Sequence, residues 1–253
     1  MDAAFQLADV GAAELALIAA VALAGSILGG LAGYGTGLVV PIFLAPVVGV
    51  VNVVPVMAVG MIFANGSRVA AFSREIHWPH ARRILVVGLP ACVAGAYAYT
   101  LLEARWVALL LGTFFVISVP VRRLLARAGW RLEARGVTVA GAGFGFVNGS
   151  MTGVGLLLIS MLMAAGLEGA ALIATDAIVS VIMGAAKIVL FGSVARLDAE
   201  LALAGVLIGL CTMPGAFIAR RLLALVPLKA HTAFMDVVVL GGGASFLWRA
   251  AFA

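Results

Sequence analysis

Four ionisable side chains stand inside long apolar runs of this sequence, where charged residues are scarce. Lys187 lies about four residues from the end of such a run, and Asp176 precedes it by eleven residues. That interval is close to three helical turns, so both side chains face the same way on a helix. Arg68 and Asp236 are the other two. A charge at a bilayer centre costs roughly 2.5–3.5 kcal/mol on insertion scales, so each residue is a candidate for binding or moving an ion.

Each of these four residues also has a structural interpretation. Lys187 can extend its ammonium group to the membrane interface, and Arg68 lies near enough to the loop at 74–83 that this snorkelling is the favoured expectation there. Asp176 forms a structural ion pair with Lys187 or Arg68, takes and releases a proton during transport, or lies at a helix end. Asp236 lies only about six residues into the last apolar run, which favours an interfacial position.

Two glycine clusters of equal spacing, about 120 residues apart, indicate an internal repeat. The first reads Gly25-x3-Gly29-x3-Gly33-x-Gly35, and the second reads Gly145-x3-Gly149-x3-Gly153-x-Gly155. Farther along each half, Arg68 matches Lys187. We interpret the early glycines of each cluster as close helix-packing positions. The later ones (Gly33, Gly35, Gly37, Gly153 and Gly155) predict a broken helix with exposed backbone amides, because a proline or a short apolar piece follows.

Helix starts at such breaks would favour an anion. The first backbone N–H groups of a helix have no partner within it, and the helix dipole adds partial positive charge there. Irregular backbone at membrane depth must line a cavity or be packed in protein. The predicted substrate-binding residues are Gly33, Gly35, Thr36, Gly37, Asn65, Arg68, Thr152, Gly153, Gly155 and Lys187. Ser150 and Asn148 are further hydrogen-bond donors, and Asp176 and Asp236 are candidates for proton coupling or ion pairing.

The elements that would position these residues are membrane-spanning helices. No charged residue occurs between Glu14 and Arg68, and a spanning helix needs about 20 apolar residues. We expect an all-α integral membrane protein with eight long helices, over 14–32, 53–73, 83–101, 105–121, 136–151, 168–191, 200–219 and 230–249. Two short half-helices, over 36–50 and 153–166, each follow a glycine cluster.

The relative orientation of the two halves, and the side of the membrane on which the termini lie, depend on whether the two short pieces cross the membrane. The expected parts are a first repeat at 1–121, a basic cytoplasmic linker at 122–135 and a second repeat at 136–253. If both short pieces cross, five segments per half give inverted repeats, as in many secondary transporters, and both termini lie outside. If they are re-entrant, four crossings per half give parallel repeats. Basic residues favour a cytoplasmic linker in both cases, and we favour the inverted arrangement.

Composition limits the classes of protein to consider. Of the 253 residues, 64% are hydrophobic and 11% are charged, with a mean hydropathy of +1.21. Soluble proteins average about 25% charged residues, so this chain must face lipid over much of its surface. The net charge of +5 lies in short loops and predicts no nucleic-acid partner. Abundant Arg, Ala and Gly beside scarce Lys suggest a bacterial cell (inner) membrane.

Other site classes find little support in the sequence. Cys92 and Cys211 lie in apolar runs, without metal-ligand spacing. His77, His80 and His231 flank the membrane in expected loops. An intramembrane enzyme would need a convergent catalytic set at membrane depth, and no histidine lies in the middle of an expected span. We therefore expect no enzymatic activity, no cofactor and no metal.

The stretch "GGLAGYGTGLVVPIFL" at 29–44 resembles the Gly-rich motif of the TauE/SafE sulfite exporter family, which opens that family's first repeat. A degenerate copy, "NGSMTGVGLLLISMLMAAGL", stands at 148–167 and lacks a proline expected near Met161. The resemblance covers nearly the whole chain. It implies a secondary transporter, often an exporter, of small sulfur-containing or organic anions such as sulfite, sulfonates or sulfoacetate, with protons as a candidate coupling ion. A passive anion channel and a permease for another small solute are the alternatives.

Overall fold

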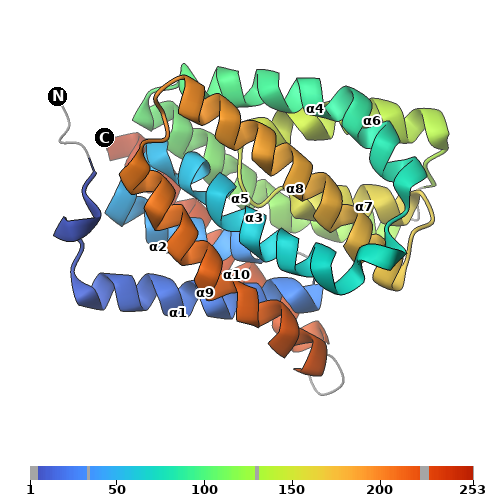
Figure 1. Cartoon of the computed structure of the whole chain (residues 1–253), viewed down its shortest axis with the longest axis horizontal. Helices are drawn as coiled ribbons and strands as arrows, with labels where there is room; N and C mark the ends of the chain where they lie inside the picture. Colours follow the sequence, from blue (N-terminus) through green and yellow to red (C-terminus); the bar gives the residue numbers. More distant parts are fainter. Residues whose placement is uncertain (1–4, 33–34, 129–130, 223–227, 253) are drawn as a thin grey trace.

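The computed structural model describes residues 5–32, 35–128, 131–222 and 228–252, and these residues form a bundle of helices without strands (Figure 1). The helices of the first half are α1 (Ala12–Ala32), α2 (Thr36–Val48), α3 (Val53–Phe72), α4 (Trp78–Thr100) and α5 (Ala104–Ala128). Those of the second half are α6 (Ala134–Ser150), α7 (Gly155–Ala164), α8 (Gly169–Ser193), α9 (Ala199–Leu222) and α10 (Leu228–Phe252). Short 3-10 turns stand at Leu7–Asp9, Val50–Asn52 and Ser73–Glu75. The expected all-α class is confirmed.

Both predicted helix breaks are present. Helix α1 ends at Ala32 and α2 begins at Thr36, while α6 ends at Ser150 and α7 begins at Gly155. The helices that follow the breaks have 13 and 10 residues, which is short for a membrane crossing. Each break therefore places a helix start beside the end of the preceding helix.

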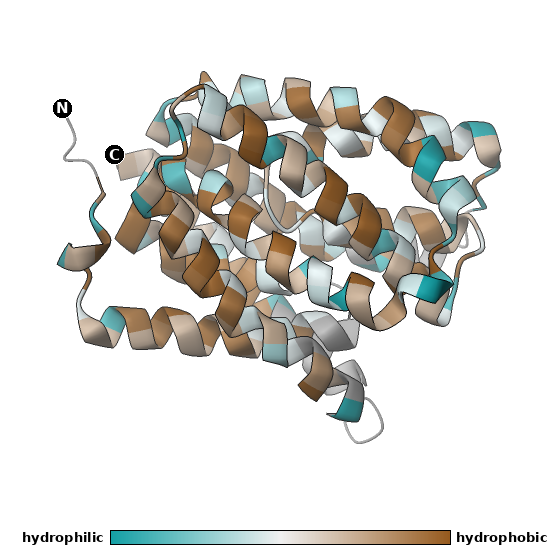
Figure 2. Cartoon of the chain, viewed as in Figure 1, coloured by the Kyte–Doolittle hydropathy of each residue, from teal (hydrophilic) through white to brown (hydrophobic). Residues whose placement is uncertain are grey.

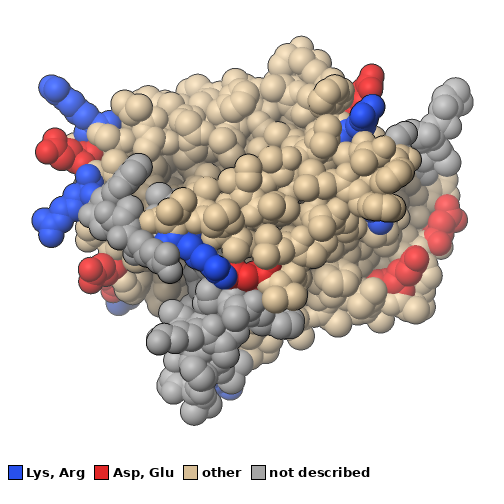
Figure 3. All heavy atoms as spheres, turned by 180° about the vertical axis from the view of Figure 1, so that it is seen from behind, with Lys and Arg blue, Asp and Glu red and all other residues tan. Residues whose placement is uncertain are grey.

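Six helices of the described residues are long and apolar enough to cross a membrane: α1, α3, α4, α5, α8 and α9. Apolar residues predominate along the helices in Figure 2, and Val86 of α4, Val139 of α6 and Val189 of α8 are each more than 70% exposed. In Figure 3 most charged side chains of the visible face gather toward its two ends, with a broad area of other residues between them. An apolar belt between charged ends is the surface of a protein surrounded by lipid.

Two helix boundaries differ from the sequence-based expectation. Helix α4 begins at Trp78, with His77 as its N-cap and Pro79 in its first turn, so His80 lies on the helix and not in a loop. Helix α5 continues to Ala128, through Arg123, where the sequence predicted that a linker would begin at 122. In both cases a polar residue next to an apolar run suggested an end, although charged side chains are tolerated in the outer turns of a helix.

Pairs of helices from the two halves pack together. Helix α1 lies against α9 and α4 against α6, while α3 packs on α8 and on α9, and α5 on α10. Helices α3 and α8 run antiparallel: Arg68 pairs with Asp176, whereas Gly184, farther along α8, packs on Ile62, which comes earlier in α3. Helices α3 and α8 lie in the interior, where Met57 and Met183 are fully buried.

Candidate functional site

A cavity lies where the two helix breaks meet α3 and α8. The starts of α2 and α7 form one part of its wall, through Thr36 and Gly155 and their neighbours. Facing stretches of α3 and α8 contribute the rest. Of the described residues that line the cavity, three are charged: Arg68, Asp176 and Lys187. A second, entirely apolar cavity between α1, α2 and α9 has no charged lining residue.

The walls from α3 and α8 are copies of one pattern. Met57, Met61, Asn65 and Arg68 line the cavity from α3, and Asp176, Ser180, Gly184 and Lys187 line it from α8. Each residue of the first set stands 119 positions before its counterpart in the second. Residues separated by four, four and three positions lie on the same face of a helix. The predicted repeat therefore matches the two helix faces position by position, and their side chains differ.

The two breaks touch each other at the cavity. The hydroxyl of Thr152 donates to the carbonyl oxygen of Gly37 at 3.3 Å, which ties the second break to the first turn of α2. Gly153 has a φ of +80°, a conformation that L residues rarely adopt, and a Cβ there would lie 2.8 Å from the Gly37 carbonyl oxygen. The hydroxyl of Thr36 donates to the Gly25 carbonyl at 3.1 Å and fixes α2 against α1. Two helix starts, whose first amides have no partner within the helix, are thus held together at one place.

Lys187 lies inside the protein. The residue is 7% exposed, and its ammonium group donates to the backbone carbonyl of Asn148 at 2.9 Å, at the end of α6. The ion pairs found among the described residues do not include Lys187. An ammonium group has three N–H donors, so a single carbonyl leaves donors available to a bound anion.

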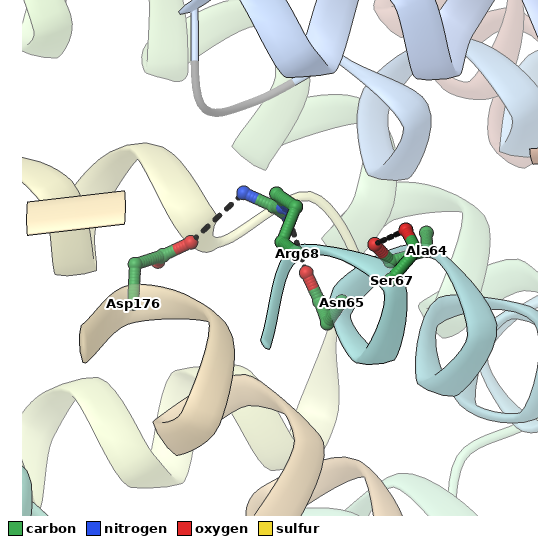
Figure 4. A network of polar contacts seen from close by, with 5 residues as sticks. All are labelled: Ala64, Asn65, Ser67, Arg68 and Asp176. Atoms are coloured by element: carbon green, nitrogen blue, oxygen red, sulfur yellow. Dashed lines mark hydrogen bonds and ion pairs between the residues drawn. The ribbon is translucent and has the colours of Figure 1, made fainter. Parts of the chain in front are cut away.

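Arg68 makes an ion pair inside the protein with an acid from the other half. Its Nη1 lies 3.2 Å from Oδ2 of Asp176, and its Nη2 donates to the side-chain oxygen of Asn65 one turn earlier on α3 (Figure 4). The Arg68 side chain is 12% exposed, so the expectation that it snorkels to the interface is wrong. Of the two partners expected for an ion pair with Asp176, Lys187 and Arg68, the structure has Arg68. Eleven residues along α8 span about 16 Å, too far for Asp176 to pair with Lys187.

The comparison with known families agrees with this architecture. The model of the family described as Sulfite exporter TauE/SafE matches residues 17–246, nearly the whole chain. The chain belongs to the sulfite exporter TauE/SafE family. No curated protein and no solved structure matches it.

Membership of the sulfite exporter TauE/SafE family confirms the resemblance found in the sequence and, with the apolar helices, makes the chain a multi-pass membrane protein. The proteins of this family are transporters rather than enzymes. Among the described residues there is no cluster of three or more His, Cys, Asp or Glu side chains that could hold a metal ion.

The cavity gathers most of the residues predicted for the site. Nine of the ten predicted substrate-binding residues line it: Gly35, Thr36, Gly37, Asn65, Arg68, Thr152, Gly153, Gly155 and Lys187. Gly33 lies outside the described residues. Asp176 and Asn148 also line the cavity. That any of these residues contacts a substrate stays a prediction.

Other predicted residues lie elsewhere. Asp236 is absent from the lining of the cavity; it pairs with Nη2 of Arg123 at 2.7 Å, where α10 packs on α5. The hydroxyl of Ser150 is used within the fold, donating to the carbonyls of Gly95 and Phe146. His77 and His80 lie at the start of α4, with 2.6 Å between their Nδ1 atoms, and they do not line the cavity.

Sequence reasoning did not select four of the eight matched positions, Met57, Met61, Ser180 and Gly184; it also did not select Ala58, which lines the cavity from α3 beside Met57. Methionine, serine and glycine are common in membrane helices, so none stands out by type. The repeat could have found them. Ser180 and Gly184 share a helix face with Asp176 and Lys187. Subtracting 119 from these four residue numbers gives the four positions on α3.

Proposed function

We propose that this protein is a secondary transporter that exports small sulfur-containing or organic anions, such as sulfite or sulfonates, bound in the cavity between the starts of α2 and α7. One observation supports this most directly. Two helix starts and two basic side chains from matched helices border the same interior cavity. Membership of the sulfite exporter TauE/SafE family supports the substrate class and the direction of transport.

The chemistry of the cavity suits an anion. Backbone N–H groups at helix starts offer hydrogen bonds and partial positive charge, and Lys187 adds a full charge with donors to spare. Small residues, Gly37 and Gly153, allow the two starts to approach closely. An oxyanion with three or four oxygens could accept from both starts and from Lys187 at once.

The proposal includes an inverted arrangement of the two halves, and the directions of the helices support it. If α2 and α7 each count as a crossing, α3 is the third segment and α8 the eighth, so they run in opposite directions. If they do not, α3 is the second crossing and α8 the sixth, and the two run in the same direction. The antiparallel course of α3 and α8 favours the first count.

Helices α5 and α10 provide a second instance of the same argument. Gly112 packs on Leu247, whereas Arg123, farther along α5, pairs with Asp236, earlier in α10, so these helices are also antiparallel. Fifth and tenth segments run oppositely, but fourth and eighth crossings would not. Exchanging the halves also maps the α1–α9 packing onto that of α6 and α4. In this arrangement the basic segment at 122–135 lies in the cytoplasm, both termini lie outside, and the repeats are 1–121 and 136–253.

Asp176 is the group that we assign to proton coupling. It is 1% exposed, lines the cavity and pairs with Arg68, so a proton on its carboxylate would release Arg68 to interact with the anion. Anion flux should then respond to a pH gradient in the wild type.

The experiment is flux into proteoliposomes that contain the purified protein. Uptake of radiolabelled sulfite, sulfoacetate, other sulfonates and simple carboxylates would be compared, with and without a pH gradient and with protein-free liposomes as the control. We expect saturable uptake of at least one sulfur-containing anion and competition by its relatives. Flux that does not saturate with anion concentration and does not respond to a pH gradient would indicate a passive channel. Absence of flux for every anion, in protein shown to be folded, would refute the proposal.

A further inference from the structure

The two matched walls of the cavity differ in one charge. Arg68 and Lys187 occupy equivalent positions in the two halves, but the counterpart of Asp176 in the first half is Met57. The acid is therefore present on one wall only, and it reaches the basic residue of the other half. The three charged residues of the described lining sum to one positive charge.

Asp176 pairs with Arg68 through only one of its two carboxylate oxygens. Its Oδ2 accepts from Arg68 at 3.2 Å, whereas its Oδ1 is the buried side-chain atom of the described residues that has no hydrogen-bond partner. An ionised carboxylate oxygen in the interior repels a second negative charge strongly, because the surroundings screen it poorly. Arg68 is held by Asp176 and by Asn65, and in this state its charge is already balanced.

Lys187 is in a different position. It donates to a neutral backbone carbonyl, and its charge is not balanced by an acid among the ion pairs of the described residues. A monovalent anion beside Lys187 leaves the cavity electrically neutral. A divalent anion leaves one negative charge unbalanced in the membrane interior, where uncompensated charge is costly.

From this arrangement we propose that Asp176, while its carboxylate is ionised and paired with Arg68, is the residue that determines substrate charge, restricting the cavity to anions with a single negative charge. The inference rests on the proposed anion site and goes beyond it, because it states which ionisation state of an anion binds. Replacing Asp176 alone by a neutral residue leaves the charge of Arg68 unbalanced, so the cavity can hold an anion with a second negative charge. Removing both members of the pair returns the cavity to one positive charge.

The test uses two probes of nearly equal shape. Methanesulfonate and sulfate are both tetrahedral, and they differ by a methyl group in place of an anionic oxygen. Competition of each against a labelled anion, at one fixed pH and without a gradient, gives a ratio of affinities for the purified protein. We expect the wild type to prefer methanesulfonate and Asp176→Asn to shift the ratio toward sulfate by about tenfold or more.

Two further variants separate charge from contact. Arg68→Gln/Asp176→Asn should restore the wild-type preference, and because it removes the buried pair as a whole, it still tests the idea if Asp176→Asn fails to fold. Asp236→Asn is the matched control. Asp236 is also a buried acid, 5% exposed and paired with an arginine, but it does not line the cavity. The Asp236→Asn variant should therefore have the wild-type ratio of affinities for the two probes.

An unchanged ratio in Asp176→Asn, an equal shift in Asp236→Asn, or a preference for sulfate in the double variant would overturn the inference. These outcomes differ from failure of the proposed function. If the cavity is not an anion site, the wild type binds neither probe and Lys187→Met changes nothing. If only the inference is wrong, anions bind in a Lys187-dependent way but without regard to Asp176.

Discussion

The two ends of the cavity use the same repeat position for different purposes. At one end, Arg68 is paired with Asp176 and with Asn65. At the other, Lys187 donates to the Asn148 carbonyl and belongs to none of the ion pairs found among the described residues. The acid that pairs with Arg68 has Met57 as its counterpart 119 positions earlier, so Lys187 has no matching acid on the facing helix wall. The comparison teaches that one basic residue holds the halves together, while the other is available to a ligand.

The largest effect should come from removing the available charge. Lys187→Met keeps the length and apolar character of the side chain but loses the donors, and hydrogen bonds to charged groups contribute enough for a 10- to 100-fold effect, in rough terms. We expect anion flux in proteoliposomes to fall by about that factor. Arg105→Met, at an exposed position, is the matched control and should leave flux within about twofold. Equal, small effects from both changes would remove Lys187 from the site.

The contact between the two helix breaks should be nearly as sensitive. Gly153→Ala places a Cβ against the Gly37 carbonyl and Leu38 at a φ of +80°, so the two helix starts must move apart. We expect flux to fall about tenfold while the protein still inserts and purifies as a single species. Gly143→Ala on α6, where a Cβ meets no atom within 4 Å, is the control and should behave as wild type. Normal flux in Gly153→Ala would mean that the contact of the breaks is not needed.

A smaller effect is expected when the balanced end is neutralised as a unit. Arg68→Gln/Asp176→Asn replaces a buried ion pair by neutral groups, which is often close to neutral for stability. Without a pH gradient, flux of a monovalent anion should stay within about fivefold of the wild type, whereas Arg68→Gln alone, which leaves Asp176 buried and unpaired, should unfold at a lower temperature. A double variant as inactive as Lys187→Met would show that both ends bind the anion directly.

The sequence supplied the outline of the site because the relevant features are local. Glycine weakens a helix and a short apolar piece follows each of the two clusters, so the starts of α2 and α7 were predicted at Thr36 and within two residues of Gly155. Charged residues inside apolar runs are rare, so Lys187 and Asp176 were conspicuous. Boundaries were less certain at α4 and α5, where polar residues at the ends of apolar runs continue the helix into the interfacial region.

The sequence could not supply the pairing of these residues. Asp176 shares a helix face with Lys187, which made that pair attractive, but the distance along α8 separates them. Only the antiparallel packing of α3 on α8, a contact between segments 108 residues apart, brings Arg68 to Asp176. The same packing turns Arg68 inward, against the expectation of snorkelling. Asp236 shows the converse, because an acid that looked similar in sequence is committed to Arg123, outside the cavity lining.

The most direct measurement is the position of a bound anion. Crystals of the wild-type protein grown with a selenonate that carries a single negative charge, in which selenium replaces sulfur as an anomalous scatterer, would locate the anion from its anomalous signal alone. The account predicts an anomalous peak in the cavity, within hydrogen-bonding reach of Lys187 and of the amides that begin α2 and α7. A protein that transports the same anion yet shows its peak elsewhere, with this cavity empty, would contradict the account.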